Sequence, residues 1–198
     1  MNTILFIILA ILPTNPVFII DFLIPIRSLH RESFKEMKLT SIGDFGLLRK
    51  SRPDIPSHLH TGIDIQRPTN NYLDEPIFAI TKGVVISLRN DGPYAQIIIE
   101  HRKQSMIFWS VYEHISGIKI NVSDSVNSNT SIARFMNKDE LNKYGWQFDH
   151  LHFEILKVKP IKIKKDASNP YRFFKSYTLQ CYSNKDLEHY YFNPMQLF

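Results

Sequence analysis

The middle of the chain alternates between short apolar segments and polar turns. The segments are rich in isoleucine, valine and aromatic residues, and turn sequences such as Asn90-Asp91-Gly92-Pro93 separate them. Short β-branched segments joined by tight turns are typical of antiparallel sheets, sandwiches and barrels. No sustained helical period interrupts this section. We therefore predict a mainly β fold, with strands over residues 77–80, 83–89, 95–101 and 106–114.

The flanking sequence predicts further short elements. Asn137-Lys138-Asp139-Glu140 resembles a capping box, because the acidic residue follows the capping residue at the third position. It predicts a short helix that ends near Tyr144. Ser168-Asn169-Pro170 is a second candidate helix start. We expect additional strands over residues 22–26, 118–122, 131–136 and 148–156.

The strand over residues 148–156 carries a pair of histidines. Side chains in a strand alternate between its two faces, so His150, His152 and Glu154 share one face. The residues between them are apolar. This pattern predicts a strand with a core-facing side and an imidazole-bearing side.

A second histidine motif, His58-Leu59-His60-Thr61-Gly62-Ile63-Asp64, lies far earlier in the chain. An extended backbone over residues 61–65 places His60 and Asp64 on one face, and Gly62 permits a tight backbone there. A third histidine, His114, follows Val111-Tyr112-Glu113. We predict that a β-sheet brings the three stretches together into one site.

The residue types in these stretches suit a divalent metal. Catalytic zinc binds three protein ligands, here imidazole nitrogens and one carboxylate oxygen, and keeps a fourth position for water. Zinc lowers the pKa of that water to about 7, so that it can attack a peptide carbonyl. The remaining imidazoles can act as base and oxyanion stabiliser. The same ligands also suit other divalent metals.

Composition limits the class of protein. A chain of 198 residues fits one domain, and the single cysteine, Cys181, excludes an intramolecular disulfide and a four-cysteine zinc site. The net charge of +5 favours anionic partners in general. We see no motif for nucleic-acid binding and expect no nucleic-acid partner. The lysine-rich residues 157–165 suit an anionic wall polymer or a membrane surface, or form a solvated hairpin.

The two histidine motifs together resemble the paired signatures of the lysostaphin-like zinc endopeptidases, a family of metallopeptidases that cleave peptidoglycan. Three further matches fall in the family's order: Phe45-Gly46, Gly83-Val84-Val85 and Tyr112-Glu113-His114. Asn193-Pro194 also matches, although the resemblance is good mainly over residues 25–152. It implies a small antiparallel β-sheet or sandwich-like barrel that encloses a groove, with short peripheral helices.

The resemblance also implies residue roles. One Zn²⁺ per chain would be held by His60, Asp64 and His152. The catalytic residues would be His114 and His150, which flank the attacking water, orient or deprotonate it, and stabilise the tetrahedral intermediate.

Several segments depart from the family pattern. Serine and asparagine replace glycines in residues 123–128, and residues 137–148 replace a glycine-rich loop that borders the family's substrate groove. Asp149 stands where a small residue or proline is usual. Residues 157–188 resemble an insertion. These departures bear on substrate preference.

Other candidate residues have two interpretations each. His58 is an extra ligand or a loop histidine, and His101 is a site residue or a packed strand residue; we favour the second interpretation for both. Glu154 either supports a metal ligand or is solvated. Trp109 and Trp146 line a groove or belong to the core, and strand aromatics are usually core residues.

We therefore expect a zinc metalloendopeptidase that hydrolyses peptide cross-links of bacterial peptidoglycan. The alternative is a non-catalytic module on the same scaffold that binds cell wall or activates other hydrolases; a metalloenzyme acting on another peptide is a third hypothesis. We expect a monomer, exported to the periplasm or cell wall and working near a membrane or wall surface. Residues 1–16 form either an atypical export signal or a core strand; the signal would be atypical because it lacks a basic start and a cleavage site. Residues 17–198 form the metallopeptidase domain.

Overall fold

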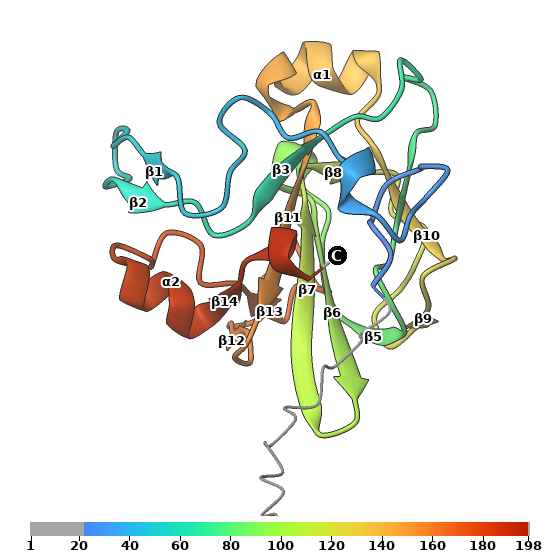
Figure 1. The fold of residues 1–198 in the computed structure, drawn as a ribbon. Helices are drawn as coiled ribbons and strands as arrows, with labels where there is room; N and C mark the ends of the chain where they lie inside the picture. Colours follow the sequence, from blue (N-terminus) through green and yellow to red (C-terminus); the bar gives the residue numbers. More distant parts are fainter. Residues whose placement is uncertain (1–21, 198) are drawn as a thin grey trace, which may run out of the picture.

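An open antiparallel sheet forms the centre of the molecule (Figure 1). The structure is a computed structural model and describes residues 22–197. Six strands follow the order β14-β11-β7-β6-β5-β9, and β3 pairs with β11 beside this path. The strands are β3 (Ile63–Gln66), β5 (Gly83–Arg89), β6 (Gln96–Lys103), β7 (Met106–Glu113), β9 (Ser125–Val126), β11 (His150–Leu156) and β14 (Tyr191–Phe192).

Three smaller sheets and short helices surround it. The sheets are β4-β10-β8, β1-β2 and β12-β13. Their strands are β1 (Leu48–Arg49), β2 (His58–Leu59), β4 (Pro76–Phe78), β8 (Ile115–Ser116), β10 (Ser131–Phe135), β12 (Ile161–Lys162) and β13 (Phe174–Lys175). The helices are α1 (Lys138–Tyr144) and α2 (Asn184–Tyr190), with 3₁₀ turns η1 (Phe34–Glu36), η2 (Gly92–Tyr94), η3 (Trp146–Phe148) and η4 (Pro194–Gln196). The predicted mainly β class is confirmed, and within residues 22–197 the sheets do not close into a barrel.

The two faces of the central sheet pack against different partners. One face contributes Ile97, Tyr112 and Phe153 to a large core that also contains Ile77 and Phe135 of the three-stranded sheet. The opposite face contributes a smaller cluster, which joins strand residues to the C-terminal part of the chain. Its buried members are Ile98, Trp109, Val111, Leu156, Cys181, Leu187 and Tyr191. This second face is also the one that carries the even-numbered residues of β11, and therefore His150 and His152.

The local predictions were right where side chains fix the element. Asn137 accepts from the backbone of Glu140, and Glu140 accepts from that of Asn137, so the capping box forms and α1 is confirmed. The predicted strand over residues 118–122 is wrong. Ile118 and Ile120 pack against the core, but the segment makes a backbone bond to Ile132 and no ladder. The alternation of apolar residues over 118–122 therefore reflects burial against the core and not pairing with another strand.

Two other expected elements also differ. Residues 168–170 begin no helix, because Asn169 closes a turn with Asp166. Residues 22–26 run beside β4, with an isolated bridge from Ile26 to Ile77, and form no regular strand. The expected export signal over residues 1–16 lies outside the described residues. No helix in residues 22–197 is long and apolar enough to span a bilayer.

Gly62 allows β3 to lie close to β11. A Cβ atom at this position would lie 2.3 Å from the backbone oxygen of Phe153, which cannot rotate away. We expect Gly62→Ala to lower the free energy of unfolding by about 1–3 kcal/mol, because the two strands must separate to admit the methyl group. Urea denaturation of metal-free protein measures this. Val84→Ala, at a 42% exposed position of β5, is the control and should cost less than about 1 kcal/mol. An unchanged midpoint for Gly62→Ala would contradict the proposed close contact.

Candidate metal centre

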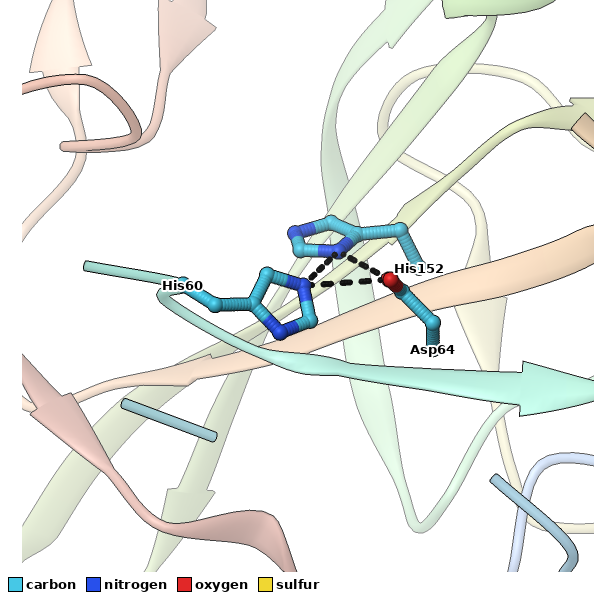
Figure 2. A group of neighbouring side chains, drawn as sticks. All are labelled: His60, Asp64 and His152. Carbon is cyan, nitrogen blue, oxygen red and sulfur yellow. Dashed lines mark hydrogen bonds and ion pairs between the residues drawn. The ribbon is translucent and has the colours of Figure 1, made fainter. Parts of the chain in front are cut away.

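The two histidine motifs meet where β3 pairs with β11. In this antiparallel pair His152 lies directly opposite Asp64, although 88 positions separate them in the chain. His60 precedes β3 and points at the same place (Figure 2). Figure 2 shows that the three side chains converge on one point. Asp64 comes from β3, His152 from β11, and His60 from the segment that precedes β3.

Three ligand-type atoms form a small triangle. His60 Nε2 lies 3.1 Å from Asp64 Oδ1 and 3.0 Å from His152 Nδ1, and 2.9 Å separates Asp64 Oδ1 from His152 Nδ1. Tetrahedral zinc with ligands at about 2.0 Å needs atoms about 3.3 Å apart, so the triangle need expand only slightly. All three residues are buried, and their donor set is the imidazole and carboxylate chemistry of a divalent-metal site. The residues present therefore fit a zinc ion.

Neighbouring groups fix which nitrogen of each histidine faces the triangle. Nδ1 of His60 donates to the backbone oxygen of Asp44 at 2.9 Å, which leaves the Nε2 lone pair free. Nε2 of His152 donates to Glu154 Oε1 at 3.2 Å, so Nδ1 is the nitrogen that faces the triangle. Such outer contacts set the tautomer and orientation of metal-binding histidines. Glu154, whose role the sequence left open, is fully buried and supports His152.

Arg49 holds the other oxygen of Asp64. Its Nη2 donates to Asp64 Oδ2 at 2.6 Å, while Oδ1 faces the two histidines. The guanidinium comes from β1, which pairs with β2 at the start of the first motif. Sequence analysis missed Arg49 and the carbonyl of Asp44. Phe45-Gly46 marked this region as part of the pattern, but no residue spacing indicates that a side chain 15 positions earlier reaches Asp64.

The charges of the site are strongly coupled. Burial would raise the pKa of Asp64, but the hydrogen bond from protonated His152 and the surrounding site outweigh burial and hold it well below its usual range. Burial would lower the pKa of His152, but hydrogen bonds to Asp64 and Glu154 raise it to about 10. In metal-free protein a proton thus sits between two carboxylates. A divalent cation would replace that proton, as metal binding to histidine generally does.

His114 and His150 lie beside the triangle. Their ring centroids are 4.9 Å apart, and His150 Nε2 lies 3.6 Å from Asp64 Oδ1. Burial lowers the pKa of both histidines to about 4, so both are neutral at pH 7. His114 occupies the corner between β7 and β8 with a φ of 62°, a conformation that non-glycine residues adopt at strained positions. Nδ1 of His114 donates to the oxygen of Pro93 at 2.6 Å.

The remaining candidates lie apart from the triangle. His58 is buried, and its Nδ1 hydrogen-bonds to the oxygen of Pro56. His101 is buried in the sheet and contacts Ser110 Oγ at 2.7 Å. Trp109 belongs to the smaller core cluster, whereas Trp146 is exposed. His101 is a packed strand residue, as we favoured. The favoured interpretation of His58 as a loop histidine is wrong, because His58 lies in β2 and is buried.

A mainly β scaffold that joins a buried His-Asp-His group to two further imidazoles defines a candidate metal-dependent hydrolase. The family model described as peptidase family M23 matches residues 58–170, which include all five of these residues. The chain therefore belongs to peptidase family M23. A search of curated proteins found no match.

Solved structures with a similar fold include members of this family. A zinc-containing peptidase from Vibrio cholerae is 24% identical with a TM-score of 0.46; the alignment covers 68% of this chain and 36% of that one. A histidine-for-alanine mutant of the catalytic domain of the prophage-encoded M23 protein EnpA from Enterococcus faecalis is 24% identical with a TM-score of 0.42, covering 62% and 82%. The SpoIIQ–SpoIIIAH pore-forming complex contains a chain that is 17% identical with a TM-score of 0.46, covering 70% and 85%.

The coupling of His152 to two carboxylates predicts a pH dependence of stability. Its pKa is raised to about 10 in the folded state from the ordinary value of 6.5, so the stabilisation is complete below about pH 6.5. In chelator-treated protein, we expect the free energy of unfolding to fall by about 1 kcal/mol or more as pH rises from 6.5 towards 10. Urea titrations at several pH values measure this fall.

His152→Gln is the matched variant, because it keeps a hydrogen-bonding side chain without a titratable group. The difference in unfolding free energy between wild type and His152→Gln should shrink across the same pH range. A difference that stays constant from pH 6.5 to 10 would refute the raised pKa.

Proposed function

We propose that this protein is a zinc-dependent endopeptidase that hydrolyses peptide cross-links of bacterial cell-wall peptidoglycan. The observation that carries the proposal is the buried convergence of His60, Asp64 and His152, with the tautomer of each histidine set by a neighbour. We assign one Zn²⁺ per chain to these three ligands. Membership of peptidase family M23 and the resemblance to peptidoglycan-cleaving enzymes support the substrate class.

The proposed reaction divides its tasks among five residues. Bound zinc would supply Lewis-acid polarisation of the substrate carbonyl and would activate water as a nucleophile. His60, Asp64 and His152 would hold the ion. The hydrogen bond from Nδ1 of His114 to Pro93 leaves its Nε2 lone pair free to accept a proton from the attacking water.

His150 lies next to His114, with its Nε2 3.6 Å from Asp64 Oδ1. It is 14% exposed at its side chain and neutral, so its ring can donate a hydrogen bond to the oxyanion of the tetrahedral intermediate. Two neutral imidazoles beside the ion thus provide a proton acceptor and a hydrogen-bond donor. Their positions, directly after β7 and at the start of β11, fix them relative to the ligands.

Partners and location follow from the substrate. A net charge of +5 favours approach to an anionic wall polymer. Action on peptidoglycan requires export, which fits the apolar start of the chain. We propose that the protein is a monomer.

Removal of a ligand tests the metal site. We expect His152→Ala to abolish both stoichiometric zinc binding and hydrolysis of peptidoglycan, since two ligands cannot hold the ion tightly. Zinc content after dialysis and fragment release report the two effects. His30→Ala, whose side chain is 67% exposed, is the control and should behave as wild type. Hydrolysis of peptidoglycan by a folded His152→Ala variant would contradict the assignment of His152 as a zinc ligand.

Variants of the two flanking histidines should keep zinc binding but lose catalytic activity. We expect His114→Ala and His150→Ala each to retain one zinc per chain, because neither is a proposed ligand. Their turnover should fall by about 10²–10⁴-fold, the usual contribution of acid–base catalysis. Metal analysis and steady-state kinetics on the same preparations measure both. Loss of zinc from either variant would instead make that histidine a ligand.

The substrate is tested with purified cross-linked peptidoglycan. Mass spectrometry of the released fragments, with and without a chelator, would identify the bond that is cut. Chelator-sensitive release supports the endopeptidase. One bound zinc without release would favour a non-catalytic module or a different peptide substrate.

A further inference from the structure

A loop near the C-terminus reaches both histidine motifs. This loop, residues 176–183, connects β13 to α2, and it lies beyond residue 170, where the family match ends. Leu59, which directly precedes His60, donates its backbone N–H to the oxygen of Cys181 at 2.8 Å. Thr178 Oγ1 donates to Glu154 Oε1 at 2.7 Å. The same loop thus contacts the segment before one proposed ligand and the residue that supports another.

Glu154 depends on hydroxyl groups because it is fully buried. Its Oε1 accepts from Thr178, from Thr61 Oγ1 at 2.5 Å and from His152 Nε2 at 3.2 Å. Its Oε2 has no hydrogen-bond partner among the described residues and is also buried. A buried carboxylate is stable only when hydrogen bonds compensate for lost solvation. Loss of one of the two hydroxyl donors therefore loosens the placement of Glu154 and its hold on His152.

The loop is itself firmly placed. Ser176 Oγ lies 2.7 Å from Thr178 Oγ1, and the backbone N–H of Tyr177 donates to Tyr191 Oη at 2.8 Å. The rings of Tyr177 and Tyr190 stack with centroids 4.1 Å apart. Cys181 is completely buried in the smaller core cluster. The position of Thr178 is therefore set by packing, as a positioning group requires.

We propose that residues 176–183 are a positioning element of the metal site, in which Thr178 holds Glu154 so that Glu154 orients His152 towards the ion. Thr178 is a positioning residue, because it acts through Glu154 and is not a proposed ligand. The inference rests on the proposed zinc site and assigns a role to part of the insertion-like segment 157–188.

The test replaces one hydroxyl group with a methyl group. Thr178→Val keeps the shape of the side chain, and Thr178→Ser keeps the hydroxyl. Thr69→Val is the matched control, because Thr69 Oγ1 also donates to a buried glutamate, Glu75, whose ion-pair partner is Arg27 and not a proposed ligand. Zinc affinity is measured by competition with a chromophoric chelator, and folding by urea denaturation of the metal-free proteins.

We expect Thr178→Val to bind zinc about 10–100-fold more weakly than wild type, the usual cost of losing a contact that supports a ligand. Thr178→Ser should restore most of the affinity, and Thr69→Val should bind as wild type. The imidazole Nε2–H resonance of His152 in metal-free protein should also shift in Thr178→Val and not in Thr69→Val.

Wild-type zinc affinity in folded Thr178→Val, or an equal loss in Thr69→Val, would overturn the positioning role. Failure of the proposed function has a different signature. It is a wild-type protein that binds zinc, responds to Thr178→Val as expected and releases no peptidoglycan fragments. A wild-type protein that binds no zinc would overturn both proposals.

Discussion

The pairing of β3 with β11 is the constraint on which the site depends. It fixes His152 opposite Asp64 and brings the segment that bears His60 alongside. A shift of one residue in this register would turn every side chain of β11 to the other face. The apolar residues Leu151, Phe153 and Ile155 oppose such a shift because they are fully buried in the main core. Burial on one face of β11 therefore positions the histidines on the other.

Charge balance is the second constraint. Asp64 and Glu154 are buried carboxylates on the two sides of His152, and Arg49 balances part of the charge of Asp64. Removing charges from water is costly unless each has a partner. The site satisfies this requirement with either a proton on His152 or a cation at the triangle. Metal binding and folding of the site are thus linked through the same few contacts.

The C-terminal part of the chain packs on the central sheet and also contacts the candidate metal site. Cys181, Leu187 and Tyr191 complete the cluster on the face that carries the site, and the loop between β13 and α2 contacts both motifs. Figure 1 shows α2 below the β1–β2 hairpin, and Leu59 of this hairpin packs against the cluster that contains Leu187 of α2. Segments outside the matched family region therefore take part in forming the site.

Local sequence was sufficient to predict the mainly β class, the α1 capping box and the two histidine motifs, because each depends on residues close together in the chain. It was misleading at residues 118–122, since apolar alternation also arises from packing without strand pairing. Three hydrogen bonds were decided only by the tertiary structure. They join Arg49 to Asp64, His60 to the carbonyl of Asp44, and Thr178 to Glu154. These contacts join residues brought together by sheet register and core packing, and no local spacing encodes them.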